Sequence, residues 1–418
     1  MAGSDFTTLE ALMKTYYLDR IDKQINQDAT IYQNFRKSTL TWDGNELKWP
    51  AKLGSNQGIG ATAEHKALPT PGSPKVKQFV ITSKTLFAVF SISQKLINAT
   101  KSEQGSFARG KAFSFADTMD AFVKDMNRQF IGDGSGVLAT VQGAVADSTT
   151  VNVEYAGTAD TPAAGNPIVA APGTRYLNEG MVVAIGTAAE LAAGAAVLAT
   201  INTVNDQDTF TTTAAVTLVD GDLIVRAKAL DNHSYNAEIT GLLKHISDDT
   251  GTYQGLSRLT YRKIRGNVFR NGGVLRDIDD NLLLMAYDRP REEVGGEIDY
   301  VVGHTSIRQK LAMTMLGDRR YGNDLRGGIS GDLTYNNVKI DWDVDATFNS
   351  LFLIDSRWFE VAEKYKGWLA EDGRTIRLSA SGAADWEAIY NWEGEFVCRK
   401  PRANSLASDL NATITSGN

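Results

Sequence analysis

Apolar residues recur at helical intervals in one segment of the first third of the chain. These residues are Phe115, Met119, Phe122, Met126 and Phe130. Spacings of three and four residues place all five on one face of an α-helix. The pattern predicts an amphipathic helix over residues 111–131, about 30 Å long. We interpret its apolar face as core packing and not as a ligand groove.

The N-terminal region predicts a shorter helix and strand-like segments. Thr7 and Glu10 form a capping-box pattern ahead of a second helical apolar stripe. Strand-like sequences follow at residues 46–53 and 76–92. Between them, residues 54–74 contain several Gly and Pro residues and no periodicity. A loop of that length is uncommon in a compact domain unless it serves a function or is disordered.

Residues 137–226 differ in amino-acid composition from the rest of the chain. They are rich in Ala, Gly, Thr and Val, and short β-like runs alternate with turns. These runs are residues 151–155, 181–186, 198–204, 209–218 and 222–227. The Ala-rich piece TAAELAAGAAVLA is open to a short helix as well. We expect a small β-barrel or sandwich inserted into a mixed α+β host.

Beyond residue 231 the pattern predicts an α/β domain. LLLMAY (282–287) predicts a helix, YVVG (300–303) predicts a strand, and Thr305 is expected to cap a further helix. A basic run predicts one more helix over residues 257–270. Its members are Arg258, Arg262, Lys263, Arg265 and Arg270. We interpret this basic face as solvent-exposed, or as a salt-bridge surface between subunits, ahead of DNA contact.

Five residues mark the last fifth of the chain, where an aromatic-Gly-x-x-x-Cys-x-x-Pro-Arg-like run closes the sequence. They are Trp392, Gly394, Cys398, Pro401 and Arg402. This region resembles the C-terminal end of tailed-bacteriophage major capsid proteins with the Hong Kong 97 fold. The order of elements along the rest of the chain is similar to that family too, except for residues 137–228.

The resemblance implies an α+β, Hong Kong 97-like fold with an inserted β-barrel or sandwich. The implied parts are an N-terminal arm (1–44), an extended hairpin loop (45–92), a peripheral domain with the spine helix (93–136), the inserted β-rich domain (137–228), an apical domain (229–360) and a return to the peripheral domain with the C-terminus (361–418). No scaffold-like region precedes the arm, so we expect any assembly scaffold to be a separate protein.

The function implied is that of a major capsid protein. Copies of the chain would assemble as pentamers and hexamers into an icosahedral shell enclosing double-stranded DNA, in a virion assembled in the host cytoplasm. A scaffolding protein, a portal and a decoration protein are the other implied partners, and no catalytic residue, cofactor or metal is implied. The alternatives are the shell of a cellular nanocompartment and a β-rich tail or adhesin component.

The resemblance also predicts contacts between subunits. The charged, Gly-rich apical tip at residues 317–332 would surround the fivefold and sixfold axes, where head-to-tail contacts close into rings. The predicted contact residues of the tip are Asp318, Arg319, Arg320, Asp324 and Arg326. Lys66, Lys75 and Lys77, in or beside the 54–74 loop, are further candidates. Some relatives cross-link a loop lysine to an asparagine, but nothing in this sequence identifies such a partner.

Charge limits how the protein treats DNA. The formal net charge is −7, and residues 137–226 alone account for it, with nine acids against two bases. The rest of the chain is balanced, so we expect no strong phosphate binding through net charge. A single cysteine, Cys398, excludes an intramolecular disulfide. No apolar run approaches the roughly 18 residues that a membrane span requires, so we expect an intracellular protein with no membrane contact.

One motif mimics a phosphate-binding loop. Gly105, Gly110 and Lys111 have the required spacing, and Leu351–Asp355 resembles the strand that would present a magnesium ligand. Ala112, however, stands where the loop needs a Ser or Thr hydroxyl. We interpret the motif as a lead into the long helix and the strand as ordinary core.

Two other patterns suggest metal sites and fail. Asp341, Asp343 and Asp345 suggest a calcium loop, but Ala346 replaces the necessary Gly. The three acids alternate with apolar residues, which is typical of a half-buried strand with one wet face. The four histidines are His65, His233, His245 and His304. They show no metal-ligand spacing, and the sequence therefore predicts no metal centre.

Overall fold

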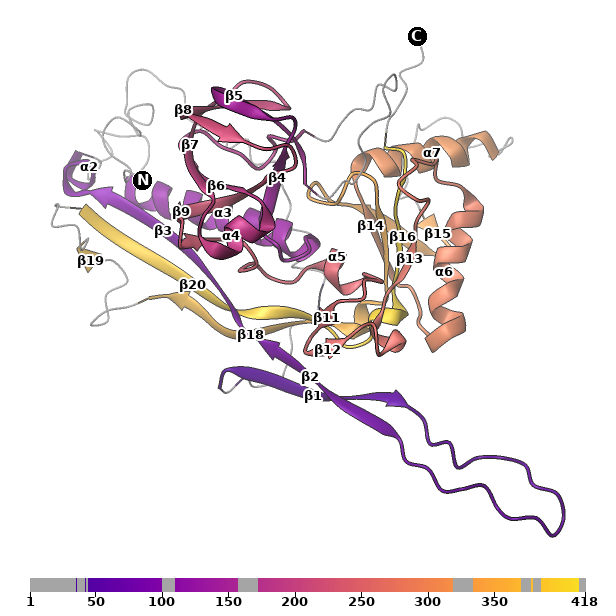
Figure 1. Cartoon of the computed structure of the whole chain (residues 1–418). Helices are drawn as coiled ribbons and strands as arrows, with labels where there is room; N and C mark the ends of the chain where they lie inside the picture. Colours follow the sequence, from indigo (N-terminus) through magenta and orange to yellow (C-terminus); the bar gives the residue numbers. More distant parts are fainter. Residues whose placement is uncertain are drawn as a thin grey trace.

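Figure 1 shows the computed structural model of the chain, in which a long hairpin projects from a body of several packed parts. The structure describes residues 35, 42, 44–99, 110–156, 172–318, 334–369, 377–378 and 385–412. The predicted N-terminal helix and nearly all of the predicted apical tip lie outside these residues. The mixed α and β character expected from the sequence is confirmed.

A long antiparallel sheet and one long helix form the centre of the body. β20 (Asp385–Cys398) pairs with β18 (Phe359–Trp368) on one side and with β3 (Lys84–Ser93) on the other, and the short β19 (Arg377–Leu378) extends the sheet. The helix α3 (Gly110–Ile131) packs against it, and a short α2 (Gln94–Ala99) follows β3. The helix predicted at residues 111–131 is confirmed.

Phe122, Met126 and Phe130 of the apolar stripe face the sheet, as their spacing predicts. The ring of Phe122 lies 5.2 Å from that of Tyr390, and the ring of Phe130 lies 5.0 Å from that of Phe396. Met126, Phe130 and Trp392 belong to one buried core. Burial of this apolar area is the main stabilising contribution at the junction between helix and sheet.

The hairpin consists of β1 (Glu46–Gly54) and β2 (Lys75–Thr82), paired antiparallel from Glu46 opposite Thr82. Residues 55–74 connect the two strands without regular helix or strand. The strand-like sequence at 76–92 is therefore two strands separated at Ser83. The first strand belongs to the hairpin and the second, β3, to the long sheet.

The segment between α3 and residue 233 forms a β-barrel. Its strands are β4 (Val137–Val141), β5 (Val145–Tyr155), β6 (Val182–Gly186), β7 (Val197–Val204), β8 (Thr209–Leu218) and β9 (Leu223–Ala229), with a short β10 (Asn232–His233) beside β9. The strand order is β9-β4-β5-β8-β7-β6, and pairing of β6 with β9 closes the barrel. The predicted barrel is confirmed. The Ala-rich piece forms the helix α4 (Ala188–Ala193), with a capping box between Thr187 and Glu190.

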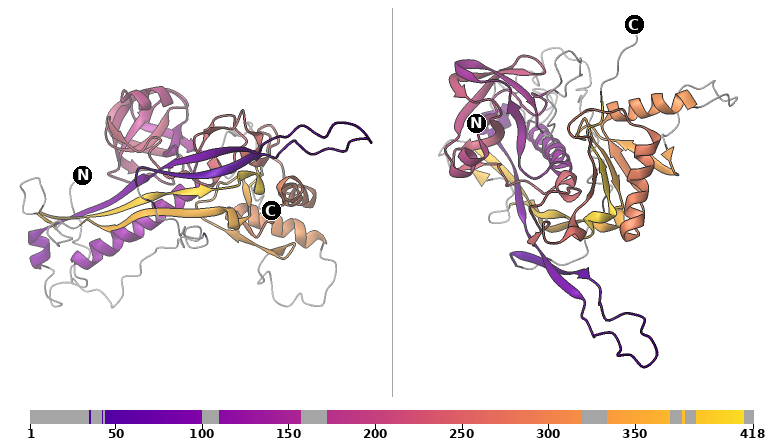
Figure 2. Two further views of the ribbon diagram at one scale, coloured as in Figure 1. Left: turned by 90° about the horizontal axis from the view of Figure 1, so that it is seen from below. Right: turned by 45° about the vertical axis from the view of Figure 1, so that its right-hand side comes forward.

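A second sheet stands beside the first, with two helices at its side (Figure 2, right). Its order is β13 (Asn267–Phe269), β21 (Ser405–Ala407), β17 (Leu351–Ile354), β14 (Tyr300–Gly303), β16 (Val338–Trp342) and β15 (Thr334–Tyr335). The helices are α6 (Asp280–Val294) and α7 (Thr305–Asp318). The helix and the strand predicted at 282–287 and 300–303 are confirmed. The helix α7 begins at Thr305 itself, and the cap is the preceding His304, whose ring nitrogen accepts a hydrogen bond from the Ser306 amide.

The helix predicted over residues 257–270 is wrong. That stretch contains the end of β12 (Leu256–Ser257), a 3-10 helix (Arg262–Ile264) and β13. Gly266 passes so close to Ile246 that a Cβ atom would lie 2.7 Å from the Ile246 carbonyl carbon. Such close tertiary packing, together with burial of the Arg258 side chain, overrides the helical spacing of the basic residues. The remaining short elements here are α5 (Leu242–His245) and β11 (Thr252–Tyr253).

Candidate functional site

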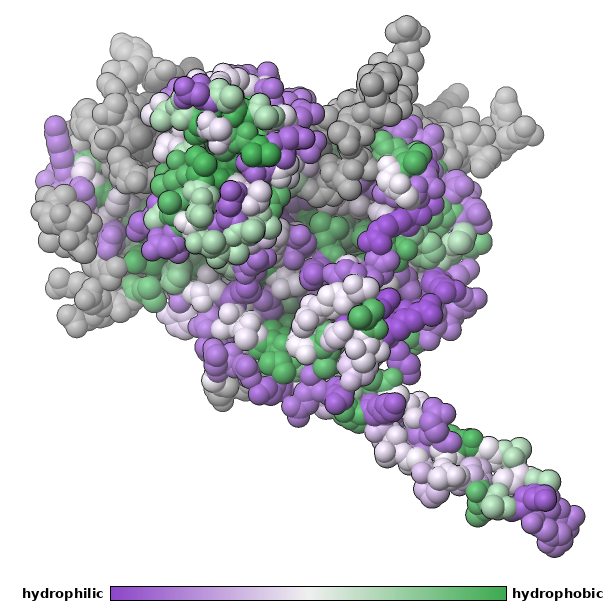
Figure 3. Space-filling view, in the orientation of Figure 1, coloured by the Kyte–Doolittle hydropathy of each residue, from purple (hydrophilic) through white to green (hydrophobic). Residues whose placement is uncertain are grey.

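The projecting hairpin presents an unusual surface for a single chain. Ile59 and Leu68 in its loop are 84% and 83% exposed. Lys66, Lys75 and Lys77 are also exposed along it. Figure 3 shows apolar and hydrophilic residues mixed along the hairpin. Isolated exposed apolar residues are ordinary, but a whole extension that lies away from its own body gains burial only by contact with another molecule.

Of the five contact residues predicted at the apical tip, the structure describes only Asp318. Asp318 is the last residue of α7. Arg319, Arg320, Asp324 and Arg326 lie outside the described residues. The contacts between neighbouring subunits at the tip therefore stay a prediction.

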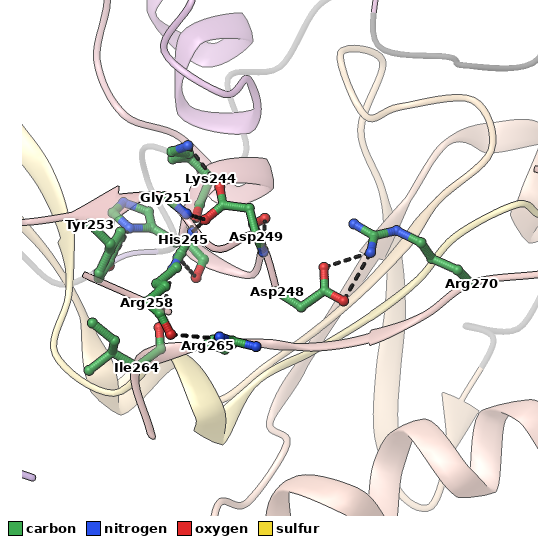
Figure 4. Close-up of polar contacts among 11 residues, drawn as sticks. Lys244, His245, Asp248, Asp249, Gly251, Tyr253, Arg258, Ile264, Arg265 and Arg270 are labelled. Carbon is green, nitrogen blue, oxygen red and sulfur yellow. Dashed lines mark hydrogen bonds and ion pairs between the residues drawn. The ribbon is translucent and has the colours of Figure 1, made fainter. Parts of the chain in front are cut away.

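Arg258, the first residue of the basic run, is a core residue and not a surface cation. Its side chain is fully buried, and its guanidinium donates hydrogen bonds to the backbone carbonyls of Lys244 (2.7 Å) and His245 (3.1 Å). It also pairs with Asp249 at 3.1 Å and lies over the Tyr253 ring at 4.2 Å. Figure 4 shows these contacts converging from three segments. The interpretation of Arg258 as part of a solvent-exposed face is therefore wrong.

Two other basic residues of the run contact a carbonyl or an acid, whereas Arg262 and Lys263 are exposed. Arg265 donates to the Arg258 carbonyl at 2.7 Å, and Arg270 pairs with Asp248 at 2.7 Å. A groove of about 650 Å³ beside α6 is lined by charges of both signs. Its charged residues are Arg262, Arg265, Arg289, Arg402, Asp248, Asp288, Glu292 and Glu293. A phosphate backbone needs clustered positive charge, so this mixed surface is a poor DNA site.

Two groups that often carry chemistry are held inert by burial. Burial lowers the pKa of His245 to about 3, so its ring is neutral, and Nε2 donates to the Phe396 carbonyl at 3.1 Å. Burial also raises the pKa of the Cys398 thiol to about 12. A reactive cysteine needs an accessible thiolate. Both residues therefore act here as core residues beside Tyr253, whose hydroxyl lies 2.7 Å from His245 Nδ1.

The wet-face prediction is wrong for Asp343 and Asp345, whereas Asp341 lies on β16, is partly exposed and pairs with Lys339 at 3.1 Å. β16 ends at Trp342, which is 44% exposed, whereas Asp343 and Asp345 are buried. The Asn127 side-chain amide of α3 donates to Asp343 at 3.1 Å and to Asp345 at 2.9 Å. Burial raises the pKa of Asp345. The two acids serve as acceptors that connect the second sheet to α3.

Asp345 and α3 also contact the end of the barrel nearest to α3, which we call the root of the barrel. Arg175 pairs with Asp345 at 3.7 Å, and the Tyr176 hydroxyl donates to Asp345 at 3.2 Å. Arg226 of β9 pairs with Asp125 of α3 at 3.3 Å. Charged contacts thus link three parts of the molecule that are far apart in sequence.

A second buried group lies next to it on α3. Arg128 pairs with Glu238 at 2.6 Å and with Asp125 at 3.2 Å. Burial tends to raise the pKa of Asp125, but the positive charges of Arg128 and Arg226 outweigh it and lower that pKa. Buried charges are stable only when paired and hydrogen-bonded, and this group meets both conditions.

The residues that carry the C-terminal resemblance have packing and ion-pair roles. Trp392 is buried on β20, and a Cβ atom at Gly394 would lie 2.5 Å from the Ala362 carbonyl oxygen of β18. Pro401 is buried in the turn that leads to β21, and Arg402 forms an ion pair with Glu293 of α6. These residues are structural in this molecule.

The other candidate motifs form no chemical site in the described part of the chain. α3 begins at Gly110, and Gly105 lies outside the described residues. Asp355, after the buried β17, is engaged by Arg357 at 2.7 Å. Among the residues that the structure describes, no group of three or more His, Cys, Asp or Glu side chains is placed to hold a metal ion. None of the described helices has the length and hydropathy to cross a membrane.

The comparisons with known proteins identify the fold. No protein-family model matches the sequence, and a search of curated proteins found no match. Among solved structures, the chain is similar to the Cyanophage A-1(L) capsid, with a TM-score of 0.60 and 11% identity over 98% of this chain and 100% of that chain. The chain therefore has a phage capsid fold, as the sequence resemblance predicted.

Two further similarities are weaker. The native GTA particle capsid has a TM-score of 0.48 and 11% identity over 97% of this chain and 99% of that one. The SrpI encapsulin of Synechococcus elongatus PCC 7942 has a TM-score of 0.46 and 7% identity over 100% of this chain and 99% of that one.

Sequence reasoning missed the residues of the buried junction. Asn127 and Arg128 lie on the face of α3 that the apolar stripe leaves open, and Arg175 is one of two bases in an acidic segment. That imbalance is the one signal that could have pointed to a partner, because a base among many acids has carboxylates as candidate ion-pair partners. Its partner, Asp345, is visible only in the fold.

Proposed function

We propose that this chain is a major capsid protein whose copies assemble as pentamers and hexamers into an icosahedral shell around double-stranded DNA. The observation that carries the proposal is the match of fold over the full length of the cyanophage capsid chain. The projecting hairpin supports it, because an extension with exposed apolar residues suits contact between copies.

In this proposal each part of the molecule has a place in the shell. The hairpin is the extended loop and lies over a neighbouring copy, with Lys66, Lys75 and Lys77 at the contact. The helix α3 is the spine helix of the peripheral domain, the second sheet belongs to the apical domain, and the barrel is an inserted accessory domain. The residues from Asp318 to Arg326 contact their neighbours around the symmetry axes.

In this proposal the shell encloses DNA without binding it strongly. Within the basic run, Arg258 is buried in the core and Arg270 is paired with Asp248. Strong non-specific binding depends on the release of counterions by clustered free Lys and Arg. The proposed partners are a scaffolding protein, a portal and a decoration protein in a virion assembled in the host cytoplasm, and no catalytic step is needed.

The alternatives are the shell of a cellular nanocompartment and a β-rich tail or adhesin component. A nanocompartment shell would enclose a protein cargo and not a genome. A tail or adhesin component would form trimers or fibres and not closed particles. The content and shape of the assembled particle therefore separate all three.

Negative-stain microscopy of the expressed chain, alone and with the scaffold encoded beside it, tests the proposal. We expect closed particles with fivefold and sixfold clusters, and nuclease-protected DNA in particles from infected cells. Trimers or fibres as the largest species would contradict the shell function. Closed particles filled with a co-encoded enzyme would establish the nanocompartment in place of the capsid.

A further inference from the structure

Both bases of the acidic segment form ion pairs at the root of the barrel. Residues 137–226 contain nine acids but only Arg175 and Arg226 as bases. Arg175 pairs with Asp345, in the loop that follows β16, and Arg226 pairs with Asp125 of α3. Neither base is available to balance the acids at the other end of the barrel.

That other end, which we call the distal end, consists of residues 142–147 and 219–222. It lies opposite the point where β4 enters the barrel from α3, and the two turns meet where the Gly143 amide donates to Asp220 at 2.7 Å. Asp147 and Asp220 are both exposed there. Val219, next to Asp220, is 63% exposed. The distal end is therefore an anionic surface around an exposed apolar residue.

The hairpin presents the opposite charge. Lys75 and Lys77 are exposed and lie two residues apart on β2, so their side chains share one face of the strand. The two acids of the hairpin are engaged next to their own positions, Glu46 by Lys48 and Glu64 by His65. Long lysine stems cover apolar surface while their charged heads meet carboxylates, which suits a surface of two acids around Val219.

A single copy cannot make this contact. The hairpin and the barrel extend from different sides of the body (Figure 1). In the left view of Figure 2, however, the barrel and the end of the hairpin both lie on the upper side of the molecule, with α3 below. A second copy beside the first can therefore bring its barrel to the height of this hairpin.

We propose that the hairpin of one copy binds the distal end of the barrel of a second copy, with Lys75 and Lys77 pairing with Asp147 and Asp220. This inference rests on the proposed shell function and names the surface that receives the hairpin. The barrel is then an assembly element that draws neighbouring copies together.

Zero-length carbodiimide cross-linking tests the contact, because it joins only a lysine and a carboxylate already in contact. Particles assembled from an equal mixture of isotopically light and heavy chains are cross-linked and digested, and the joined peptides are identified by mass spectrometry. We expect mixed light-heavy peptides that join Lys75 or Lys77 to Asp147 or Asp220. The double variant Asp147→Asn with Asp220→Asn should lose these cross-links, because it lacks both carboxylates. It should still fold, because Asn tolerates the positive φ at position 147 and keeps an acceptor for the Gly143 amide.

A matched variant controls for net charge. Asp206→Asn with Asp208→Asn removes two exposed acids from the opposite end of the barrel. We expect the distal variant to slow particle formation at physiological salt roughly two- to thirtyfold, as loss of two exposed ion pairs would, and the matched variant to change it far less. Closed particles without these cross-links, or equal slowing by both variants, would overturn the inference and leave the shell function standing. Absence of both particles and cross-links would overturn both.

Discussion

Arg128 of α3 and Glu238, which precedes α5, form a buried ion pair with 2.6 Å between Nη2 and Oε1. The pair joins the long helix to the segment that leaves the barrel. Asp125 completes it from one turn earlier on the helix. The contact therefore fixes the direction in which the chain continues after the barrel.

Replacement of Arg128 by Met should destabilise the subunit strongly. Glu238 would remain buried without its ion-pair partner, and removal of one partner of a buried pair costs about 3–5 kcal/mol. Urea unfolding followed by circular dichroism measures the loss. Arg289→Met is the control, because its pairs with Glu292 and Glu293 are half exposed and should contribute about 1 kcal/mol or less. Equal losses in the two variants would show that the Arg128 pair is not buried as described.

Glu395 should make the subunit less stable as the pH rises. Burial raises its pKa to about 8, well above the ordinary value of 4.5 for a glutamate. The folded protein therefore keeps this carboxyl protonated between these two values while the unfolded chain loses the proton. Stability falls with rising pH across that window, by up to about 1.4 kcal/mol per pH unit.

The variant Glu395→Gln should remove this fall while keeping an acceptor for the Thr240 amide, which lies 2.8 Å from the carboxylate. Melting temperatures from pH 5 to pH 8, compared with those of Glu292→Gln, measure the effect. Glu292 is largely exposed, so this variant controls for the loss of one carboxyl group. An unchanged slope in Glu395→Gln would contradict the raised pKa.

Gly394 should tolerate no side chain. A Cβ atom there would lie 2.5 Å from the Ala362 carbonyl oxygen and 2.9 Å from the Trp392 ring. Gly394→Ala is expected to cost about 1–3 kcal/mol through overpacking. Gly251→Ala is the matched control, since the nearest atom to its Cβ would be 3.7 Å away. Thermal unfolding of the two variants should differ clearly, and similar melting temperatures would show that the sheet relaxes at no cost.

The sequence predicted the parts of this fold that depend on local pattern. The helix α3 followed from the stripe of Phe122, Met126 and Phe130, and β8 was predicted with its observed bounds because Thr and Val suit a half-buried strand. These patterns are local, so one sequence suffices to read them.

The predictions failed where contacts between residues far apart in sequence determine the structure. Asp343 was predicted on a wet strand face, but its partner Asn127 lies 216 residues away in sequence. Arg258 was predicted on a surface helix, yet the backbone carbonyls of Lys244 and His245 hold it in the core. Spacing along the chain cannot show which distant carbonyl or amide will meet a charged side chain.

The barrel should be removable without unfolding the rest of the protein. Its core residues, from Leu138 to Ile224, pack with one another as a separate cluster. Replacement of residues 139–227 by a short Gly/Ser linker should keep cooperative unfolding and the signal of α3 in circular dichroism. Some stability will be lost, because Asp345 and Asp125 lose Arg175 and Arg226. Loss of all cooperative unfolding would show that the barrel belongs to the main core.

The most direct test of the shell function is sedimentation velocity of a chain lacking residues Asn56–Thr70. This deletion removes Ile59 and Leu68, which are exposed in the free subunit, so its melting temperature should barely change. The intact chain, run at the same concentration and in the presence of any required scaffold, should sediment as closed particles. The account predicts that the shortened chain stays as free subunits or small oligomers, whereas full-sized particles from it would contradict the role of the hairpin in assembly.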